Sequence, residues 1–203
     1  MAREEFANVQ IHVFWDVNDF PVPENRSILE IIDSLLRRYG YKGEVSITAY
    51  GEKDPEDNPL ENGITFVAKR DKFNRLDRIL VDFALVAADN HEPHRIPLTL
   101  MVVAKNIKEE NEFHGLLQSV NAANYNVLLV LPDVYDPKEV ALPYVNFAWR
   151  WTSLVDAGDP IPKPDFFSLL DEGGRREILC ANLSEDEVYN EDDSDGEGFE
   201  YHH

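Results

Sequence analysis

Residues 8–25 read NVQIHVFWDVNDFPVPEN, and this stretch joins an apolar strand to two carboxylates and a proline-marked turn. Apolar residues recur at every second position from Val9 to Trp15, a period typical of a β-strand. Pro21 and Pro23 prevent further sheet pairing, which places Asp16 and Asp19 at the carboxyl end of this strand. Ligands bind at that edge of open α/β sheets. The alternative is that Asp16 only caps the turn by accepting backbone hydrogen bonds.

The 203-residue chain is long enough for one globular domain with a sizeable core. Hydrophobic residues make up 43% of it, far from the composition of a disordered protein. The single cysteine, Cys180, allows neither an intramolecular disulfide nor a cysteine-based metal cage. The first ten residues lack the apolar run of a secretory signal, and no run reaches the ~20 apolar residues of a membrane span. A cytoplasmic protein that does not enter a membrane is expected, with the nucleus as the alternative.

The formal net charge of −20 is unevenly distributed. Residues 184–203 hold nine acidic residues and neither Lys nor Arg, and we expect them to form a disordered acidic tail. The rest of the chain still has 30 acidic residues against 19 basic ones. Because phosphate contacts normally come from Lys and Arg, this balance counts against nucleic-acid binding. A bound divalent cation would reverse the sign of a carboxylate cluster locally.

Predicted strands and helices alternate along the chain. The spacing of apolar residues predicts strands at 9–15, 44–50, 64–68, 97–104, 127–131 and 145–151, the last at a sheet edge, and helices at 27–38, 76–90 and 113–123. Asp77 is expected in the first turn of helix 76–90, where the helix dipole favours a carboxylate, and Asp82 lies inside the apolar run of that helix. This order predicts an α/β fold with a mainly parallel central sheet covered by helices on both faces.

Five segments together resemble the NYN domain, a branch of the PIN-like ribonucleases, in its limkain (meiosis regulator and mRNA stability factor) form and in the plant relatives of that form. The segments are VFWDVNDFPVP (13–23), VSITAYG (45–51), LDRILVDFALVAADN (76–90), YNVLLVLP (125–132) and FAWRWTSLVDAG (147–158). They occur in the family's order and close to its spacing. The resemblance implies a PIN-like three-layer sandwich at residues 8–158, followed by an irregular extension at 159–183 and the acidic tail at 184–203.

The resemblance also implies a metal-dependent nuclease in which acidic side chains hold Mg²⁺ or Mn²⁺. A metal-activated water would attack the RNA phosphodiester while the ion stabilises the leaving oxygen. The catalytic residues implied are Asp16, Asp77, Glu112 and Glu110, of which Asp16, Asp77 and Glu112 would hold the metal, with Asp19, Asp82 and Asn106 in support.

Two motifs depart from the family pattern. The strand-end motif, usually Asp, apolar, Glu, Asn, here ends in Asn18 and Asp19. The family's Ser-Gly-Asp-x-Asp-Phe motif is replaced by AKNIKEENEF at 104–113. Counting forward from the strand places Asn106 at the first aspartate position, whereas counting back from Phe113 places Glu110 and Glu112 at the two positions. A neutral Asn106 would be a poor Mg²⁺ ligand.

These departures leave two functions within the family and one outside it. The first is metal-dependent hydrolysis of RNA, single-stranded RNA in particular, which would contribute to RNA turnover and the regulation of gene expression. The second is a catalytically impaired NYN domain that binds RNA or a protein partner. The third is an α/β domain that binds a nucleotide at the sheet edge, although no Gly-x-Gly-x-x-Gly or Walker-type loop is present. Peroxisomal association follows only by analogy with the family, because residues 201–203 are Tyr-His-His and not a Ser-Lys-Leu signal.

Overall fold

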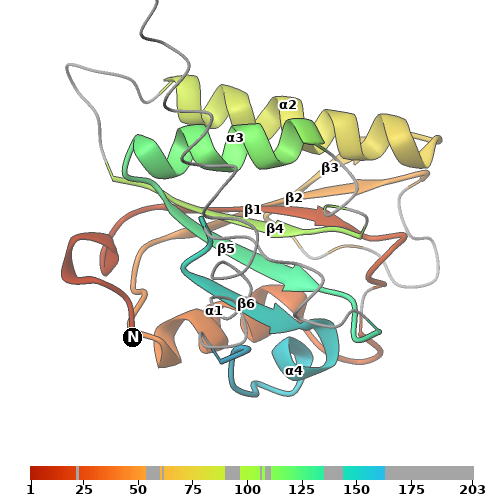
Figure 1. Ribbon diagram of the computed structural model, residues 1–203. Coiled ribbons are helices and arrows are strands. Elements are labelled where there is room, and N and C mark those ends of the chain that lie inside the picture. Colours follow the sequence, from red (N-terminus) through yellow and green to blue (C-terminus); the bar gives the residue numbers. More distant parts are fainter. Residues whose placement is uncertain are drawn as a thin grey trace, which may run out of the picture.

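A central sheet between two helical layers forms the fold in the computed structural model (Figure 1). The structure describes residues 1–21, 23–53, 60, 62–89, 97–105, 107, 111–134 and 144–162. Its elements are the 3₁₀ helix η1 (Glu4–Phe6), the strands β1 (Ile11–Asp16), β2 (Val45–Gly51), β3 (Ile64–Ala68), β4 (Thr99–Val103), β5 (Asn126–Leu131) and β6 (Phe147–Arg150), and the helices α1 (Ile28–Arg38), α2 (Lys72–Asp89), α3 (Asn111–Ala122) and α4 (Trp151–Val155).

All the strands of this six-stranded sheet run parallel, in the order β3-β2-β1-β4-β5-β6. Strand β2 pairs with one side of β1 and β3 pairs with the outer side of β2. The chain then crosses over, and β4 pairs with the other side of β1. In the register, Trp15 lies opposite Ala49 of β2 and Val103 of β4. Because the strand order reverses between β1 and β4, the carboxyl end of β1 lies at the topological switch point, where α/β folds bind ligands.

Two hydrophobic cores lie on opposite faces of the sheet. Figure 1 shows α2 and α3 over one face and α1 and α4 over the other. Successive residues of β1 point to opposite faces, so Val13 and Trp15 join the core beneath α1 and α4 while Phe14 joins the core beneath α2 and α3. The middle strands β4 and β5 are buried at every position. Strands covered on both faces account for the nearly continuous apolar runs in the sequence.

Most of the predicted elements are confirmed, and so is the predicted α/β class. In α1, the side chain of Ser27 caps the helix by accepting a hydrogen bond from the Glu30 N–H at 2.9 Å. Gly40, just beyond the last turn, has a φ of 92°, which suits glycine after a helix. The strand predicted last in the chain is β6, which lies at one edge of the sheet as expected.

Several predicted bounds differ from the observed ones by one or two residues or more, and two of these differences have an identifiable cause. Helix α2 begins at Lys72 and not at residue 76, because the carboxylate of Asp71 accepts a hydrogen bond from the Asn74 N–H at 3.1 Å and supports an earlier start. Asp77 therefore lies in the second turn, and the helix dipole does not explain its position. Trp151 begins α4 and does not continue the strand, because Asp133, just after β5, accepts a hydrogen bond from the Thr152 N–H at 3.2 Å.

Several predictions concern residues that the structure does not describe. The described residues end at Pro162, so the whole acidic tail and all but the first few residues of the extension lie outside them. Within the described ranges, no helix is both long enough and apolar enough to cross a membrane.

Candidate functional site

The turn after β1 holds Asp16 at the carboxyl edge of the sheet. Asp16 is 2% exposed, and its Oδ1 accepts hydrogen bonds from the N–H groups of Asn18 at 3.0 Å and Asp19 at 3.2 Å. The Val17 N–H donates to the carbonyl of Tyr50 at 2.9 Å, and the side-chain oxygen of Asn18 accepts from the Glu52 N–H at 2.9 Å. The turn is thereby attached to the end of β2, and Asp16 has little freedom to move.

Arg75 of α2 forms a buried ion pair with Asp16. Its Nε lies 3.0 Å from Oδ2 of Asp16, and the two side chains are only 4% and 3% exposed. The Nη1 of Arg75 donates to the carbonyls of Lys69 at 3.4 Å and Arg70 at 3.2 Å. One guanidinium therefore neutralises the strand-end carboxylate and holds the chain that leads from β3 into α2.

Burial has the largest effect on the pKa of Asp16. Burial raises the pKa of Asp16 above its usual value, because the ionised carboxylate loses hydration. The hydrogen bond from Arg75 lowers the pKa, and the charge of Asp19 raises it. Arg75 thus compensates part of the cost of burying this charge.

Asp82 has a structural role in α2. Its Oδ2 accepts hydrogen bonds from the hydroxyl of Tyr50 at 2.8 Å and from Nε of Arg78 at 2.9 Å. Burial raises the pKa of the Tyr50 hydroxyl far above its usual value, and the bond to Asp82 raises it further. Asp82 therefore points back to the end of β2 and anchors α2 over the sheet.

Asp77 lies on a different part of α2 from the buried ion pair. Its side chain is exposed and lines a surface hollow together with Lys69, Arg70 and Arg78. Asp19 is partly buried and contacts Asp16 through its backbone N–H. Of the predicted acids, Asp16 and Asp19 are thus brought together, while Asp77 and Asp82 have separate surroundings.

The remaining predicted residues fall where the structure describes little. Asn106 and Glu110 lie outside the described residues, and Glu112 is in the first turn of α3 with its side chain outside them. Among the residues described, no three acidic, histidine or cysteine side chains form a group that could hold a metal ion. The metal-ligand roles of Asp16, Asp77 and Glu112 remain predictions.

The described surroundings of Asp16 do not suit Mg²⁺ or Mn²⁺. Both carboxylate oxygens already accept hydrogen bonds, and one is paired with a guanidinium cation at 3.0 Å. Mg²⁺ requires oxygen ligands at 2.0–2.1 Å in near-ideal octahedral geometry and usually keeps several waters. A side chain that is 3% exposed and paired with a guanidinium leaves little room for a metal ion and its waters, so the arrangement resembles a carboxylate–cation pair with arginine in place of the metal.

Arg75 was not found by sequence reasoning, which set the start of the helix one residue after it. A usable signal was present, because residues 69–78 read KRDKFNRLDR and contain five basic residues and two acidic ones within a strongly acidic chain. Such a local reversal of charge marks a surface or a buried pair worth examining.

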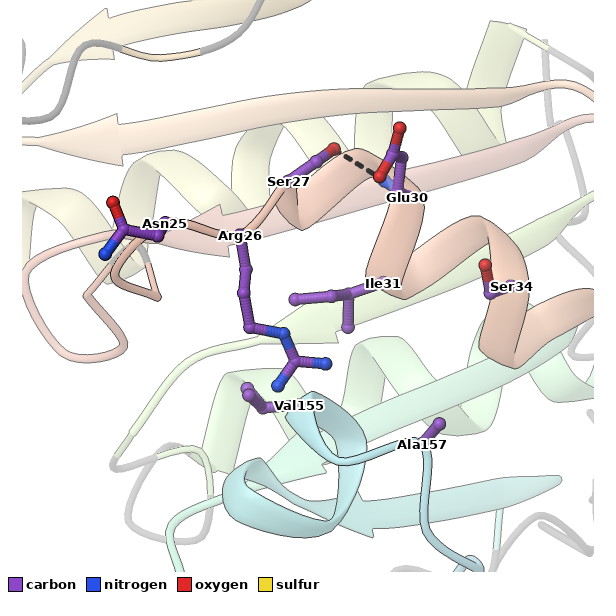
Figure 2. Close-up of a pocket in the computed structure, with 8 residues that line it drawn as sticks. All are labelled: Asn25, Arg26, Ser27, Glu30, Ile31, Ser34, Val155 and Ala157. Atoms are coloured by element: carbon purple, nitrogen blue, oxygen red, sulfur yellow. Dashed lines mark hydrogen bonds between the residues drawn. The ribbon is translucent and has the colours of Figure 1, made fainter.

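A pocket of about 320 Å³ lies between the start of α1 and the end of α4. Figure 2 shows the Arg26 side chain extending from the start of α1 towards Val155, with Ser34 one turn further along α1 than Glu30. Arg26 is exposed and pairs with Asp156, and the lining contains no Gly-rich phosphate loop. The pocket therefore adds no support to the nucleotide-binding alternative.

The parallel three-layer sandwich, with an aspartate at its switch point, is consistent with the PIN-like class of fold. The chain belongs to the NYN domain family, because the model of that family matches residues 10–145, from β1 to the residues just before β6. No curated protein matches the chain. The family assignment is thus shown, whereas the limkain-type, plant-like branch stays a prediction.

Proposed function

We propose that this NYN domain binds RNA without cleaving it and contributes to the regulation of gene expression through binding. The proposal is carried by the buried ion pair in which Arg75 Nε lies 3.0 Å from Asp16 Oδ2. In a metal-dependent nuclease of this class, that carboxylate would have to be free to ligate Mg²⁺ or Mn²⁺. Here a cation from the chain itself holds it.

The replacement of the family's Ser-Gly-Asp-x-Asp-Phe motif by AKNIKEENEF at 104–113 supports the same proposal. Catalysis by a metal ion depends on precise placement of its ligands, and a misplacement of about 1 Å can cost about 10²-fold in rate. Membership of the NYN family supports RNA as the ligand. The target would be a cytoplasmic or nuclear RNA, and a protein partner would supply sequence preference.

The first experiment is incubation of labelled single-stranded RNA with the purified full chain and Mn²⁺ or Mg²⁺, beside the Asp16→Asn and Glu112→Gln variants. The expected result is intact RNA in every lane, with RNA binding retained when EDTA replaces the metal. Cleavage by the wild-type chain that disappears in both variants would overturn the proposal and establish a nuclease that uses Asp16 and Glu112 as ligands.

A thermal melt with and without Mn²⁺ gives a readout besides activity. A ligand that binds only the native state raises its stability by about 2.7 kcal/mol when present at 100 times its dissociation constant. We expect Mn²⁺ to leave the melting temperature of the wild-type chain unchanged, because Arg75 holds Asp16. A shift that depends on Asp16 would contradict this.

A further inference from the structure

The turn between β3 and α2, together with the first residue of α2, carries three basic side chains beside the Asp16–Arg75 pair. These are Lys69, Arg70 and Lys72, all exposed, and they are called the basic turn below. Since every strand runs parallel, the carboxyl end of β3 lies at the same edge of the sheet as Asp16, two strands or about 10 Å away. The basic turn is thus part of the ligand-binding edge of the fold.

The described carboxylates form no ion pair with the cations of the basic turn. Within the described ranges, carboxylates pair with arginines elsewhere on the surface, including Arg26, Arg37 and Arg38. In the same part of the chain, no ion pair engages the side chain of Lys69, Arg70 or Lys72. The carboxylate of Asp71, which lies between them, accepts the N–H of Asn74 at the start of α2.

Arg75 holds the backbone of the basic turn in place. Its Nη1 donates to the carbonyls of Lys69 and Arg70, while its Nε binds Asp16. The Lys69 N–H donates to the carbonyl of Gly51 at 2.7 Å, which attaches the turn to the end of β2. Because the backbone is fixed from two sides, binding of a ligand need not order it, and such preorganisation favours affinity.

A surface hollow of about 490 Å³ adjoins the basic turn along α2. Lys69, Arg70 and Asp71 line it at one end, and the residues that line it along the helix are Asn74, Asp77, Arg78 and Val81. The three basic residues of the turn fall within four positions and therefore span at most about 10 Å of chain. That length suits two or three phosphates of one strand.

We propose that Arg75 takes the place of a metal ion at Asp16 and supports the basic turn as a metal-independent surface for the phosphodiester backbone of single-stranded RNA. This inference rests on the proposed function and names the surface that performs it. The phosphates lie against Lys69, Arg70 and Lys72, and the strand continues into the hollow on α2. Backbone contacts of this kind carry affinity without sequence preference.

The test measures binding of a fluorescein-labelled single-stranded RNA of roughly 20 nucleotides, an ample length for a site of this size. Anisotropy is recorded with the full chain in EDTA at several salt concentrations. The variant combines Lys69→Gln, Arg70→Gln and Lys72→Gln. The matched control combines Arg3→Gln, Arg37→Gln and Lys42→Gln, which removes the same charge from the opposite edge of the sheet, where α1 ends and β2 begins.

The basic-turn variant should bind at least about tenfold more weakly than the wild-type chain. Its plot of log affinity against log salt should be shallower by about 2 units, since each phosphate that is no longer neutralised reduces the slope by about 0.7. The control should bind like wild type after a small general charge effect. Equal weakening in both variants, or unchanged affinity in the basic-turn variant, would contradict the basic turn as the RNA-binding surface. Neither result would contradict the proposed function, because the wild-type chain would still bind RNA.

Three further outcomes separate this inference from the proposed function on which it rests. No RNA binding by the wild-type chain would overturn the proposed function and the surface together. A labelled oligoglutamate that binds as tightly as the RNA, and binds more weakly to the basic-turn variant, would show that the surface takes an acidic polypeptide and would overturn RNA as its partner. Binding that requires Mn²⁺ would overturn the replacement of the metal by Arg75.

Discussion

Burial of the ion pair between Asp16 and Arg75 costs free energy of hydration, and the pair fixes the position of both side chains. Two charges that are 3–4% exposed lose most of their hydration, and the loss is offset only while each has its partner. Arg75 also binds two backbone carbonyls, and Asp16 also accepts two backbone N–H groups, so each side chain is held by backbone as well as by its partner. Such a pair contributes to a specific arrangement of the sheet edge more than to net stability.

Removal of one member of the pair should therefore be far worse than removal of both. We expect Arg75→Met to lower the free energy of unfolding by about 3–5 kcal/mol, because an uncompensated carboxylate stays buried. Adding Asp16→Asn to that variant should recover a large part of the loss. Urea unfolding of the two single variants and the double variant measures the coupling, with Arg78→Met as a control at an exposed pair on the same helix. Additive losses would contradict a coupled pair.

A buried phenol beside the first residue of β5 gives a prediction about the pH dependence of stability. The hydroxyl of Tyr41 accepts a hydrogen bond from Nδ2 of Asn126 at 3.0 Å, and burial raises the pKa of Tyr41 to about 12. The unfolded chain loses this proton near pH 10. The stabilisation is therefore complete below about pH 10 and is lost as pH rises towards about 12, by about 2–3 kcal/mol in total.

Denaturant unfolding between pH 9 and about 11.5 tests this linkage. The wild-type chain should lose stability more steeply with pH than Tyr41→Phe, which has no proton to release at that position. Parallel curves for the two proteins would show that Tyr41 titrates alike in the native and unfolded states.

The helices differ in how strongly their own sequences specify them. Helix α1 has a serine cap, an apolar face and a glycine just after its end, so its boundaries were predicted almost to the residue. Helix α2 gained its first turn from the carboxylate of Asp71, and α4 begins where Asp133 of a neighbouring loop accepts hydrogen bonds from the N–H and the hydroxyl of Thr152. Contacts of this kind join residues from separate segments, and periodicity within one segment does not reveal them.

Helix α3 contains a glycine that nothing in its surroundings requires. Gly115 lies inside the helix, is exposed, and has no heavy atom within 4 Å of the position that a Cβ would take. Gly115→Ala should raise the free energy of unfolding by about 1 kcal/mol, because alanine loses less backbone entropy in a helix. The change is measured by urea unfolding.

Gly43, before β2, is the contrasting position. A Cβ there would lie 1.6 Å from the carbonyl oxygen of Val9, so Gly43→Ala must displace the backbone and should lower stability strongly. If Gly115→Ala also destabilised the protein, the surroundings of α3 would be tighter than the structure shows.

Basic and acidic residues are concentrated in different segments of the chain. The basic turn lies on the domain, whereas nine acidic residues without a single Lys or Arg lie at 184–203. We expect an acidic segment linked to the same chain to compete with RNA for the cations through its high effective concentration. The net charge of −20 repels RNA as well, and salt screens both effects.

Deletion of residues 184–203 should therefore raise the affinity for single-stranded RNA, by several-fold at low salt and little at high salt. A variant that keeps the length of this segment but replaces its acidic residues with Gln and Asn should behave like the deletion, because the effect comes from charge. Unchanged affinity in both variants would assign the segment a solvating role only.

Local patterns along the chain were enough to predict the strands, most of the helices and the parallel α/β class. A strand buried on both faces leaves a continuous apolar run in its own residues, and a helix buried on one face leaves a periodic apolar pattern. The position of Asp16 at a strand end followed in the same way from the prolines after it. The partner of Asp16 did not, since Arg75 lies 59 positions further along the chain and reaches the carboxylate only after β1, β2 and β3 have paired and α2 has packed over them. Whether that edge of the sheet presents a free carboxylate to a metal or a neutralised one beside a basic turn depends on this long-range packing, and no local spacing of residues encodes it.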